Sequence, residues 1–421
     1  MKSYDLIVVG GGLTGVAAAV SAAREGLSVM LVEQSGALGG ALNTNLVYPF
    51  MRYWTDCPDG TRKWLSAGIF TEIFDKTEKL CKPMSKIDFS PEHMKVVLDQ
   101  LCVEAGVDLL FHASLFEAVT EGRQVKSIRV ATKAGAMDLD AHFFIDATGD
   151  GDLLAFAGCD FQLGRESDGL CQPMTTCFRL GNVQPLSMEE KKAIRPVLNE
   201  LYLKAKAEGR INNPREDILW FRGTALGETV AHFNTTRVVK LDPTNPLDVS
   251  RAEVEARRQV LELVELLREV PAFADATLVS VATSIGVRES RKLKGAHIIT
   301  AQELKDCTRF EDSIALGNYD IDIHNPEGAG TSHYYFAPGD YYTIPYRSLL
   351  PVEFDNLLTG GRCISATHEA QASIRIMPIC ATTGQAAGTA AAVAKKTGTT
   401  THTIDIKKVQ TVLRKNGAAI D

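Results

Sequence analysis

The chain has 421 residues, of which 45% are hydrophobic, and its formal net charge is −7. This length suffices for two packed cores, and the surplus of acidic residues argues against binding to nucleic acid, whose phosphates require a surplus of Lys and Arg. The apolar run near the N-terminus is too short for a secretory signal or a membrane span, so we expect a cytoplasmic protein.

The nine cysteines are odd in number, dispersed and without a Cys-x-x-Cys pair. This pattern disfavours a disulfide framework, a zinc site and an iron–sulfur cluster, and we predict no metal ligands. Small molecules are therefore the expected partners, and the chain is compatible with a homo-oligomer.

The first clear pattern is a strand, a glycine turn, a helix and a second strand. Asp5–Val9 is short and apolar like a buried strand, Gly10–Gly15 predicts a tight turn, and the alanine-rich Val16–Glu25 predicts a helix. Ser28–Val32 predicts the second strand. This order is typical of a dinucleotide-binding unit, and the alternative is an incidental glycine turn in a buried βαβ unit.

Three glycines of the turn have the spacing G-x-G-x-x-G. Gly10 permits the turn, Gly12 lets a pyrophosphate approach the backbone, and Gly15 lets helix and strand pack closely. The backbone N–H groups at Leu13 and Thr14 would then face the phosphates at the positive end of the helix.

Glu33 ends the second predicted strand and is followed by Gln34. An acidic side chain at this place accepts hydrogen bonds from the ribose hydroxyls of an adenosine and repels a 2′-phosphate, which makes NADP the least expected nucleotide. Gly39 and Gly40 would let a second loop close over an extended dinucleotide. FAD and NAD both fit the chain up to this point.

Helices and strands then alternate along the rest of the chain. Ser90 and Pro91 predict the start of a helix that runs to about Ala105. Residues 108–146 are predicted to form strands broken by glycines, and Arg251–Val270 has the clearest amphipathic helical pattern.

Four further motifs follow in chain order. They are "FFIDATGDGDLLAFAG" (143–158), "SIGVRESRKLKG" (284–295), "YTIPYRSLLP" (342–351) and "DNLLTGGRCISATHEAQASIRIMPICATTGQAAGTAAAVAKK" (355–396). Together with the glycine turn, they resemble the FAD-dependent oxidoreductase family, which shares the glutathione-reductase type of FAD domain and is distantly similar to fumarate reductase flavoproteins. The resemblance covers most of the chain and implies FAD as the cofactor.

The resemblance also implies further cofactor contacts. The residues that it places there are Ala147, Thr148, Gly149, Gly361, Arg362 and Ile379. The first three would return to the nucleotide after a strand, the next two would pass near the pyrophosphate, and the helix beginning around Ile379 would point its N-terminus at the flavin ring.

The motifs and the resemblance together predict an α/β fold. A Rossmann-like FAD-binding domain, with a parallel sheet plus a β-meander, would span 1–158 and 352–421, and an inserted α+β substrate domain would span 159–351. Residues 43–87 fit a lid or a subunit interface as well as a plain core segment. No second dinucleotide fingerprint follows the first, so the electrons would be exchanged with a substrate or an external donor or acceptor.

Flavin dehydrogenation needs a group that takes or gives a proton and cations that hold an anionic substrate. We predict His368 as the acid or base, in a loop before the flavin-facing helix, and Arg375 as an electrostatic contact. Arg288 belongs to a charge cluster, and Tyr346 and Arg347 form a third candidate set. The alternative for each residue is a structural role, such as a bracing ion pair.

These residues lead us to expect an FAD-dependent oxidoreductase that exchanges a hydride between flavin and a small polar organic substrate, anionic in view of the arginines. One alternative is a flavin monooxygenase or oxidase that uses oxygen. Another is a flavin-bearing binding or sensor protein without turnover. The substrate, the direction of the reaction and the electron partner stay open at this point.

Overall fold

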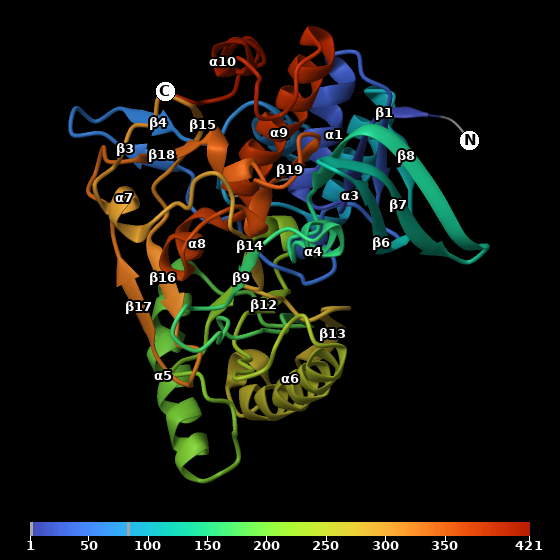
Figure 1. Ribbon diagram of the computed structural model, residues 1–421. Helices are drawn as coiled ribbons and strands as arrows, with labels where there is room; N and C mark the ends of the chain where they lie inside the picture. Colours follow the sequence, from blue (N-terminus) through green and yellow to red (C-terminus); the bar gives the residue numbers. More distant parts are fainter. Residues whose placement is uncertain (1–2, 82–84) are drawn as a thin grey trace.

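Strand β1 (Tyr4–Val9) lies inside the seven-stranded sheet that dominates the computed structural model, which describes residues 3–81 and 85–421 (Figure 1). Apart from Asp5 the strand is buried along its whole length, as in parallel sheets that helices cover. The other strands of this sheet are β2 (Val29–Val32), β5 (Asp108–Leu110), β6 (Ser114–Glu121), β7 (Gln124–Thr132), β8 (Gly135–Asp146) and β19 (Leu357–Thr359).

Strand β8 belongs to two parts of this sheet. Its C-terminal half pairs in parallel with β1 and β19, and β2 and β5 continue the parallel part. Its N-terminal half pairs with β7 in antiparallel fashion, and β7 pairs with β6. The predicted parallel sheet with a β-meander is confirmed.

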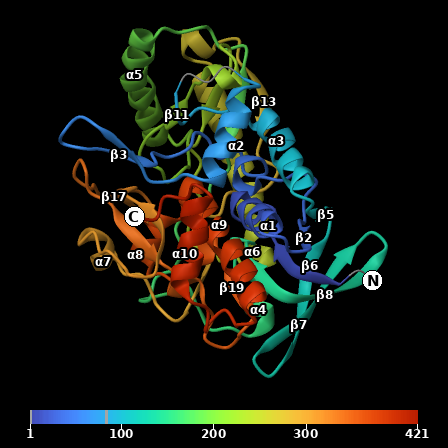
Figure 2. The same ribbon diagram turned by 90° about the horizontal axis from the view of Figure 1, so that it is seen from above.

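Helices α1 (Leu13–Arg24) and α9 (Met377–Thr397) pack side by side next to the parallel strands (Figure 2). Their backbones touch, because Gly384 and Gly388 of α9 face α1 without a side chain. A Cβ on either glycine would collide with a carbonyl oxygen of α1, that of Thr14 or that of Ala18. The small residues therefore fix the distance between the two helices.

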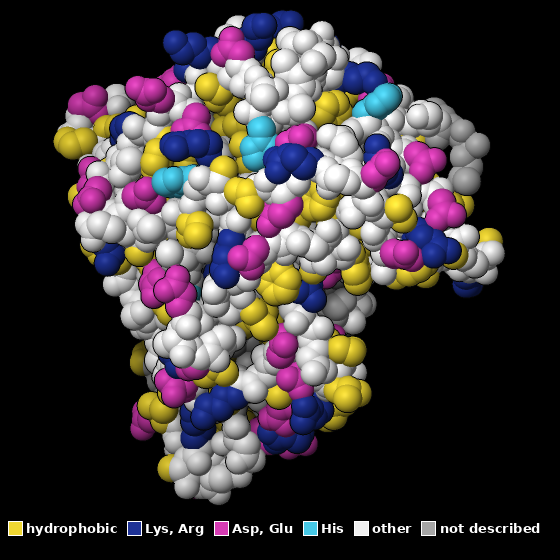
Figure 3. Space-filling model, in the orientation of Figure 1, with side chains coloured by type: hydrophobic (Ala, Val, Ile, Leu, Met, Phe, Trp, Pro, Cys, Tyr) yellow, Lys and Arg dark blue, Asp and Glu magenta, His cyan; other side chains and the backbone are white. Residues whose placement is uncertain are grey.

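A second, antiparallel sheet lies in the lower part of Figure 1. Its strands, in spatial order, are β11 (Trp220–Phe221), β12 (Ala231–Phe233), β10 (Phe178–Gly181) and β13 (Thr277–Val281). Helices α5 (Met188–Ala207) and α6 (Pro246–Leu267) contribute to the same separate core as the aromatic side chains of β10 and β12. Acidic and basic side chains gather over the outer surface of α6 (Figure 3), where Arg258 pairs with Glu255. The predicted α+β insertion is confirmed.

Short pairs of strands and short helices complete the described chain. The strand pairs are β3 (Trp54–Asp56) with β4 (Arg62–Trp64), β9 (Phe161–Leu163) with β14 (Arg291–Leu293), β15 (Ser313–Gly317) with β18 (Tyr342–Pro345), and β16 (Ile321–His324) with β17 (Thr331–Tyr334). The helices are α2 (Ile69–Glu78), α3 (Pro91–Glu104), α4 (Asp152–Ala157), α7 (Ala301–Lys305), α8 (His368–Ile374) and α10 (Ile406–Lys415).

Two helix starts test the capping signals. The Ser90 side chain accepts a hydrogen bond from the backbone N–H of His93, so α3 begins where the sequence predicts. Helix α6 begins at Pro246, well before the predicted Arg251, which corrects that prediction. The physical reason is the side chain of Asn245, which accepts two backbone N–H groups at the true start.

The described residues of segment 43–87 contribute to the main core. Phe50 stacks on Phe89 and meets Phe70 edge to face, and the rings of Tyr48 and Tyr53 are buried beside them. Residues 82–84 of this segment lie outside the described residues. A role as a lid or an interface stays a prediction, as do the domain boundaries at 158 and 352.

The part of the chain that the structure describes contains no helix long and apolar enough to span a membrane.

Gly388→Ala tests the contact between α1 and α9. The new methyl group would meet the Ala18 carbonyl oxygen, and backbone cannot yield as a flexible side chain can. We expect the free energy of unfolding to fall by about 1–3 kcal/mol in denaturant titrations. Gly328→Ala is the control, because a Cβ there meets no atom within 4 Å. An equal loss in both variants would contradict the packing argument.

Candidate active site

The turn between β1 and α1 is shaped by close backbone contacts. Gly10 has a φ of 101°, and a Cβ on it would collide with the backbone of Ala147. A Cβ on Gly15 would collide with the carbonyl oxygen of Gly10. A Cβ on Gly12, in contrast, would meet no protein atom within 4 Å. Internal packing explains the first and third glycines, whereas the second leaves room for a phosphate to reach the backbone.

The second glycine pair lies directly on this turn. The N–H of Gly39 donates to the carbonyl of Gly11 at 2.8 Å, and a Cβ on Gly40 would lie 3.0 Å from the Cα of Gly12. The structure therefore brings the second predicted loop to the first one.

Glu33 is buried and is hydrogen-bonded to the same turn. Its two carboxylate oxygens accept the backbone N–H groups of Gly11, at 2.6 Å, and Ser35, at 2.7 Å. Each carboxylate oxygen has a further lone pair, so the carboxylate can also accept a ribose hydroxyl. Gln34 is exposed next to it.

The segment after β8 returns to the glycine turn. The N–H of Ala147 donates to the carbonyl of Val9, and Thr148 donates from both N–H and hydroxyl to the buried Asp146. Gly149, with a φ of 80°, lies against the Arg362 guanidinium: a Cβ there would be 3.0 Å from it.

Arg362 is tied to this loop by an ion pair. Its guanidinium donates to the Asp150 carboxylate at 2.8 Å and to the Ser290 hydroxyl at 3.2 Å. Burial alone would lower the pKa of Arg362, but the Asp150 carboxylate outweighs it and raises the pKa. The neighbouring Gly361, with a φ of 77°, lies against the hydroxyl of Thr14.

Two helices begin at this place without a side-chain cap. In the described chain no side chain caps the start of α1 at Leu13 or of α9 at Met377, and neither first turn contains an acidic residue. Ser, Thr, Asn or Asp caps six of the other helices. The first N–H groups of α1 and α9 are thus available to an anion. Helix α9 begins two residues before Ile379, close to the predicted start.

His368 is the first residue of helix α8, whereas the sequence predicts it in a loop. The Thr367 side chain caps this short helix by accepting the N–H of Ala370. The buried His368 places its Nδ1 2.7 Å from a carboxylate oxygen of Glu289.

Glu289 is completely buried between two basic side chains. Its Oε1 lies 2.5 Å from the Nζ of Lys292, which is also completely buried. Its Oε2, the oxygen next to His368, also accepts the backbone N–H of Gln172 at 3.0 Å. Burial alone would raise the pKa of Glu289, but His368 and Lys292 lower it, so the carboxylate stays ionised. The sequence indicated a charge cluster here but not its partner His368.

Arg288 and Arg375 lie near each other beside this pair. The side chain of Gln371 in α8 donates to the backbone carbonyl of Arg288 at 3.0 Å, which joins the two segments. The Arg288 guanidinium donates to the Pro173 carbonyl and to the Thr175 hydroxyl. The structure thus brings together three of the five predicted catalytic residues.

Four arginines interact electrostatically here, and we call Arg215, Arg237, Arg288 and Arg375 the arginine cluster. Three of them have a carboxylate within 4.0 Å: Asp217 for Arg215, Glu216 for Arg237 and Asp322 for Arg375. In the described ranges Arg288 has no such partner. Burial and the other arginines lower the pKa of Arg288 to about 9.

Tyr346 and Arg347 lie apart from this group. The Tyr346 hydroxyl is buried and donates to the carbonyl of Thr401 at 2.9 Å. The half-exposed Arg347 pairs with Asp312 at 3.0 Å. These contacts explain the positions of both side chains by structural roles.

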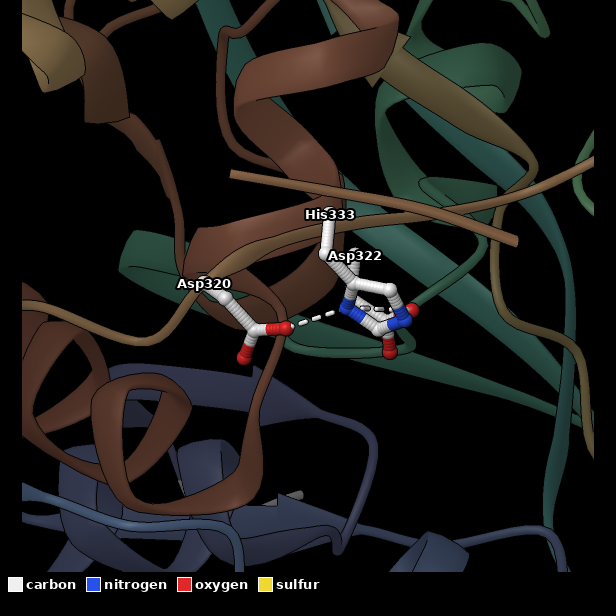
Figure 4. Close-up of side chains that lie close together, drawn as sticks. All are labelled: Asp320, Asp322 and His333. Carbon is white, nitrogen blue, oxygen red and sulfur yellow. Dashed lines mark hydrogen bonds and ion pairs between the residues drawn. The ribbon is translucent and has the colours of Figure 1, made fainter. Parts of the chain in front are cut away.

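Asp322 faces Arg375 from the β16–β17 hairpin, with Asp320 and His333 next to it (Figure 4). His333 Nδ1 lies 2.6 Å from Asp320, and the ligand atoms of all three residues lie within 4.8 Å of one another. Two carboxylates and an imidazole could hold a divalent cation. The ion pairs with His333 and Arg375 account for the same contacts, and the absence of a metal ligand stays a prediction.

Fold and site together define a dinucleotide-binding α/β protein with a cluster of charged side chains around Glu289 and Arg288. A sequence profile of the FAD dependent oxidoreductase family matches residues 5–413. The chain belongs to this family, and it is an enzyme that uses FAD. The glycine turn, the open position at Gly12 and the two uncapped helices fit this cofactor.

The fold is shared with a solved structure. A geranylgeranyl bacteriochlorophyll reductase-like protein from Thermoplasma acidophilum is 13% identical with a TM-score of 0.50, over 99% of this chain and 83% of that one. A flavoprotein/dehydrogenase from Cytophaga hutchinsonii is 12% identical with a TM-score of 0.47, over 98% and 83%. A search of curated proteins found no match.

Glu289→Gln tests the buried charge network. The substitution leaves the Lys292 ammonium buried without its carboxylate, so we expect the free energy of unfolding at pH 7 to fall by about 3–5 kcal/mol. The double variant with Lys292→Met should recover part of this loss, because it also removes the unpaired charge.

The loss should also depend on pH. Since the folded pKa of Glu289 is lower than the unfolded one, the carboxylate stabilises the protein at pH values above the unfolded pKa, and this contribution disappears as the pH falls through the folded pKa. Denaturant titrations from pH 7 to pH values well below 4.5, the ordinary pKa of glutamate, measure it. If the difference in the free energy of unfolding between wild type and Glu289→Gln increases as the pH falls, the assignment is wrong.

Proposed function

We propose that this FAD-dependent oxidoreductase exchanges a hydride with a small anionic organic substrate, held by Arg288 and Arg375, with His368 as the proton donor or acceptor. FAD would be held by the glycine turn, Glu33, the loops at Gly39–Gly40 and 147–149, Gly361, Arg362 and the start of α9. When bound, FAD supplies the group that accepts or donates the hydride.

The observation that carries the proposal is the unbalanced charge of Arg288. Its pKa of about 9 keeps it protonated at neutral pH, yet no carboxylate of the described residues lies within 4 Å of it. Arg288 is only partly exposed, and a cation that is largely removed from water is costly unless an anion pairs with it. A substrate carboxylate would supply the missing charge and add charge-assisted hydrogen bonds.

The contact between His368 and Glu289 supports the acid–base role. The Glu289 carboxylate lies 2.7 Å from Nδ1, without the angles of a regular hydrogen bond, and its charge would hold the imidazole so that Nε2 takes or gives a proton. Lys292 and the N–H of Gln172 keep this carboxylate ionised and in place. An anion held by the arginines would thus sit beside a positioned proton donor.

His368→Gln tests this role. Substrates are first found by mixing the wild-type holoenzyme with small hydroxy and amino acids without air and recording the bleaching of the flavin bands. With a substrate that bleaches the flavin, we expect kcat to fall about 10²- to 10⁴-fold in the variant, with FAD content unchanged. Arg414→Gln, on the exposed ion pair with Asp421, is the control. Unchanged kcat in His368→Gln would refute the role.

Arg288→Gln tests the anionic substrate. We expect the KM for the same substrate to rise about 10- to 100-fold, because charge-assisted hydrogen bonds to a carboxylate are lost. Arg288→Lys should lie between wild type and Arg288→Gln. Bleaching by uncharged alcohols alone, or rapid reoxidation by air without any organic substrate that reduces the flavin, would favour a different reaction.

A further inference from the structure

Three polar side chains form one row across the second sheet. In the strand register Arg179 of β10 lies directly opposite His232 of β12 on one side and Ser280 of β13 on the other. Directly opposed residues point to the same face of a sheet. Their neighbours in β10, Phe178 and Leu180, point to the other face and join the core with α5 and α6. The row therefore lies on the face turned away from these helices.

The row is buried yet lacks hydrogen-bond partners within the described chain. Arg179 is only 9% exposed, and its Nε and Nη2 atoms have no hydrogen-bond acceptor. His232 is completely buried with both ring nitrogens unpartnered, and the Ser280 hydroxyl is also buried and unpartnered. Buried polar atoms are nearly always paired in folded proteins, so this row without protein partners requires bound water or a ligand.

The charges of the row determine which chemical class of ligand would fit it. Burial lowers the pKa of Arg179, and no carboxylate among the described residues forms an ion pair with it. Burial and the nearby Arg179 lower the pKa of His232 to about 3, so its ring is neutral at physiological pH. The row thus offers one positive charge, an imidazole and a hydroxyl. A single carboxylate matches this set better than a phosphate dianion.

The surroundings place the row near the FAD-binding segments. The ring of Tyr48, a few residues beyond Gly40, meets the His232 ring edge-on at 5.4 Å, and its hydroxyl donates to Asp88. Arg288 donates to the hydroxyl of Thr175, four residues before Arg179, and the intervening Cys177 is buried in one cluster with Leu46. The row thus lies between the second sheet and the segment that follows the second glycine pair.

We propose that Arg179, His232 and Ser280 form a second anion subsite, which binds a carboxylate group of the substrate in addition to the group held by the arginine cluster. The substrate class is then a dianionic organic acid. The assignment of this carboxylate to the substrate rests on the proposed function. The binding of a carboxylate by the row does not depend on it.

The test uses Arg179→Met in the FAD-loaded protein. Removing an unpaired buried charge should raise the melting temperature of the variant above that of wild type when no carboxylate is present. Succinate and acetate should stabilise wild type in a concentration-dependent manner, and the apparent affinity for acetate should fall about 10- to 100-fold in Arg179→Met. Arg179→Lys should keep part of the affinity. Arg251→Met, at an exposed position on α6, is the control.

The outcomes separate this proposal from the proposed function. A melting temperature of Arg179→Met below that of wild type, or equal stabilisation of both by acetate, would show a structural arginine and overturn the subsite. A flavin that no carboxylate bleaches in wild type would instead refute the proposed function. A third outcome is that monocarboxylates and dicarboxylates reduce the flavin with equal KM and that Arg179→Met changes neither KM value. The row would then bind a free carboxylate and not the substrate. This result would overturn the dianionic substrate class.

Discussion

The backbone contact between α1 and α9 is the constraint on which the rest of the site depends. Gly384 and Gly388 let α9 lie against the carbonyl oxygens of Thr14 and Ala18 in α1, which places α9 beside the glycine turn. Helix α8 directly precedes α9 in the chain, so His368 and Arg375 are connected to this packed helix. One packing requirement thus aligns the nucleotide-binding backbone with the side chains proposed for catalysis.

Charge balance decides which ligand the charged side chains around Glu289 and Arg288 can bind. Glu289 is completely buried, but Lys292 and His368 neutralise it, so this group is a closed network. Arg288 and Arg179 differ, because each is a guanidinium without a carboxylate partner in the described residues. The protein holds these cations at a cost in stability, which is common where a ligand supplies the missing charge. The proposed anionic substrate follows from this imbalance.

The sequence predicted the local features of the fold well, because they depend on neighbours in the chain. The glycine turn, the cap at Ser90 and the return after β8 are encoded within a few residues. Helix α8 was missed, although Thr367 before His368 and Glu369 was an available capping signal. The pairing of His368 with Glu289 could not be predicted, since only the folded chain brings them together. Arg179 was missed, although the alternation Phe178-Arg179-Leu180 was an available signal that its side chain faces away from the core. Its lack of a partner has no local signal in the sequence.

The most direct test of the account is the absorption spectrum of the FAD-loaded protein during titration with a small carboxylate that is not oxidised, such as acetate. The account predicts a saturable shift of the flavin bands, weaker at high salt and reduced in Arg288→Gln, because the anion binds next to the flavin. A spectrum that stays unchanged while acetate also fails to stabilise the protein would contradict the anion site beside the cofactor.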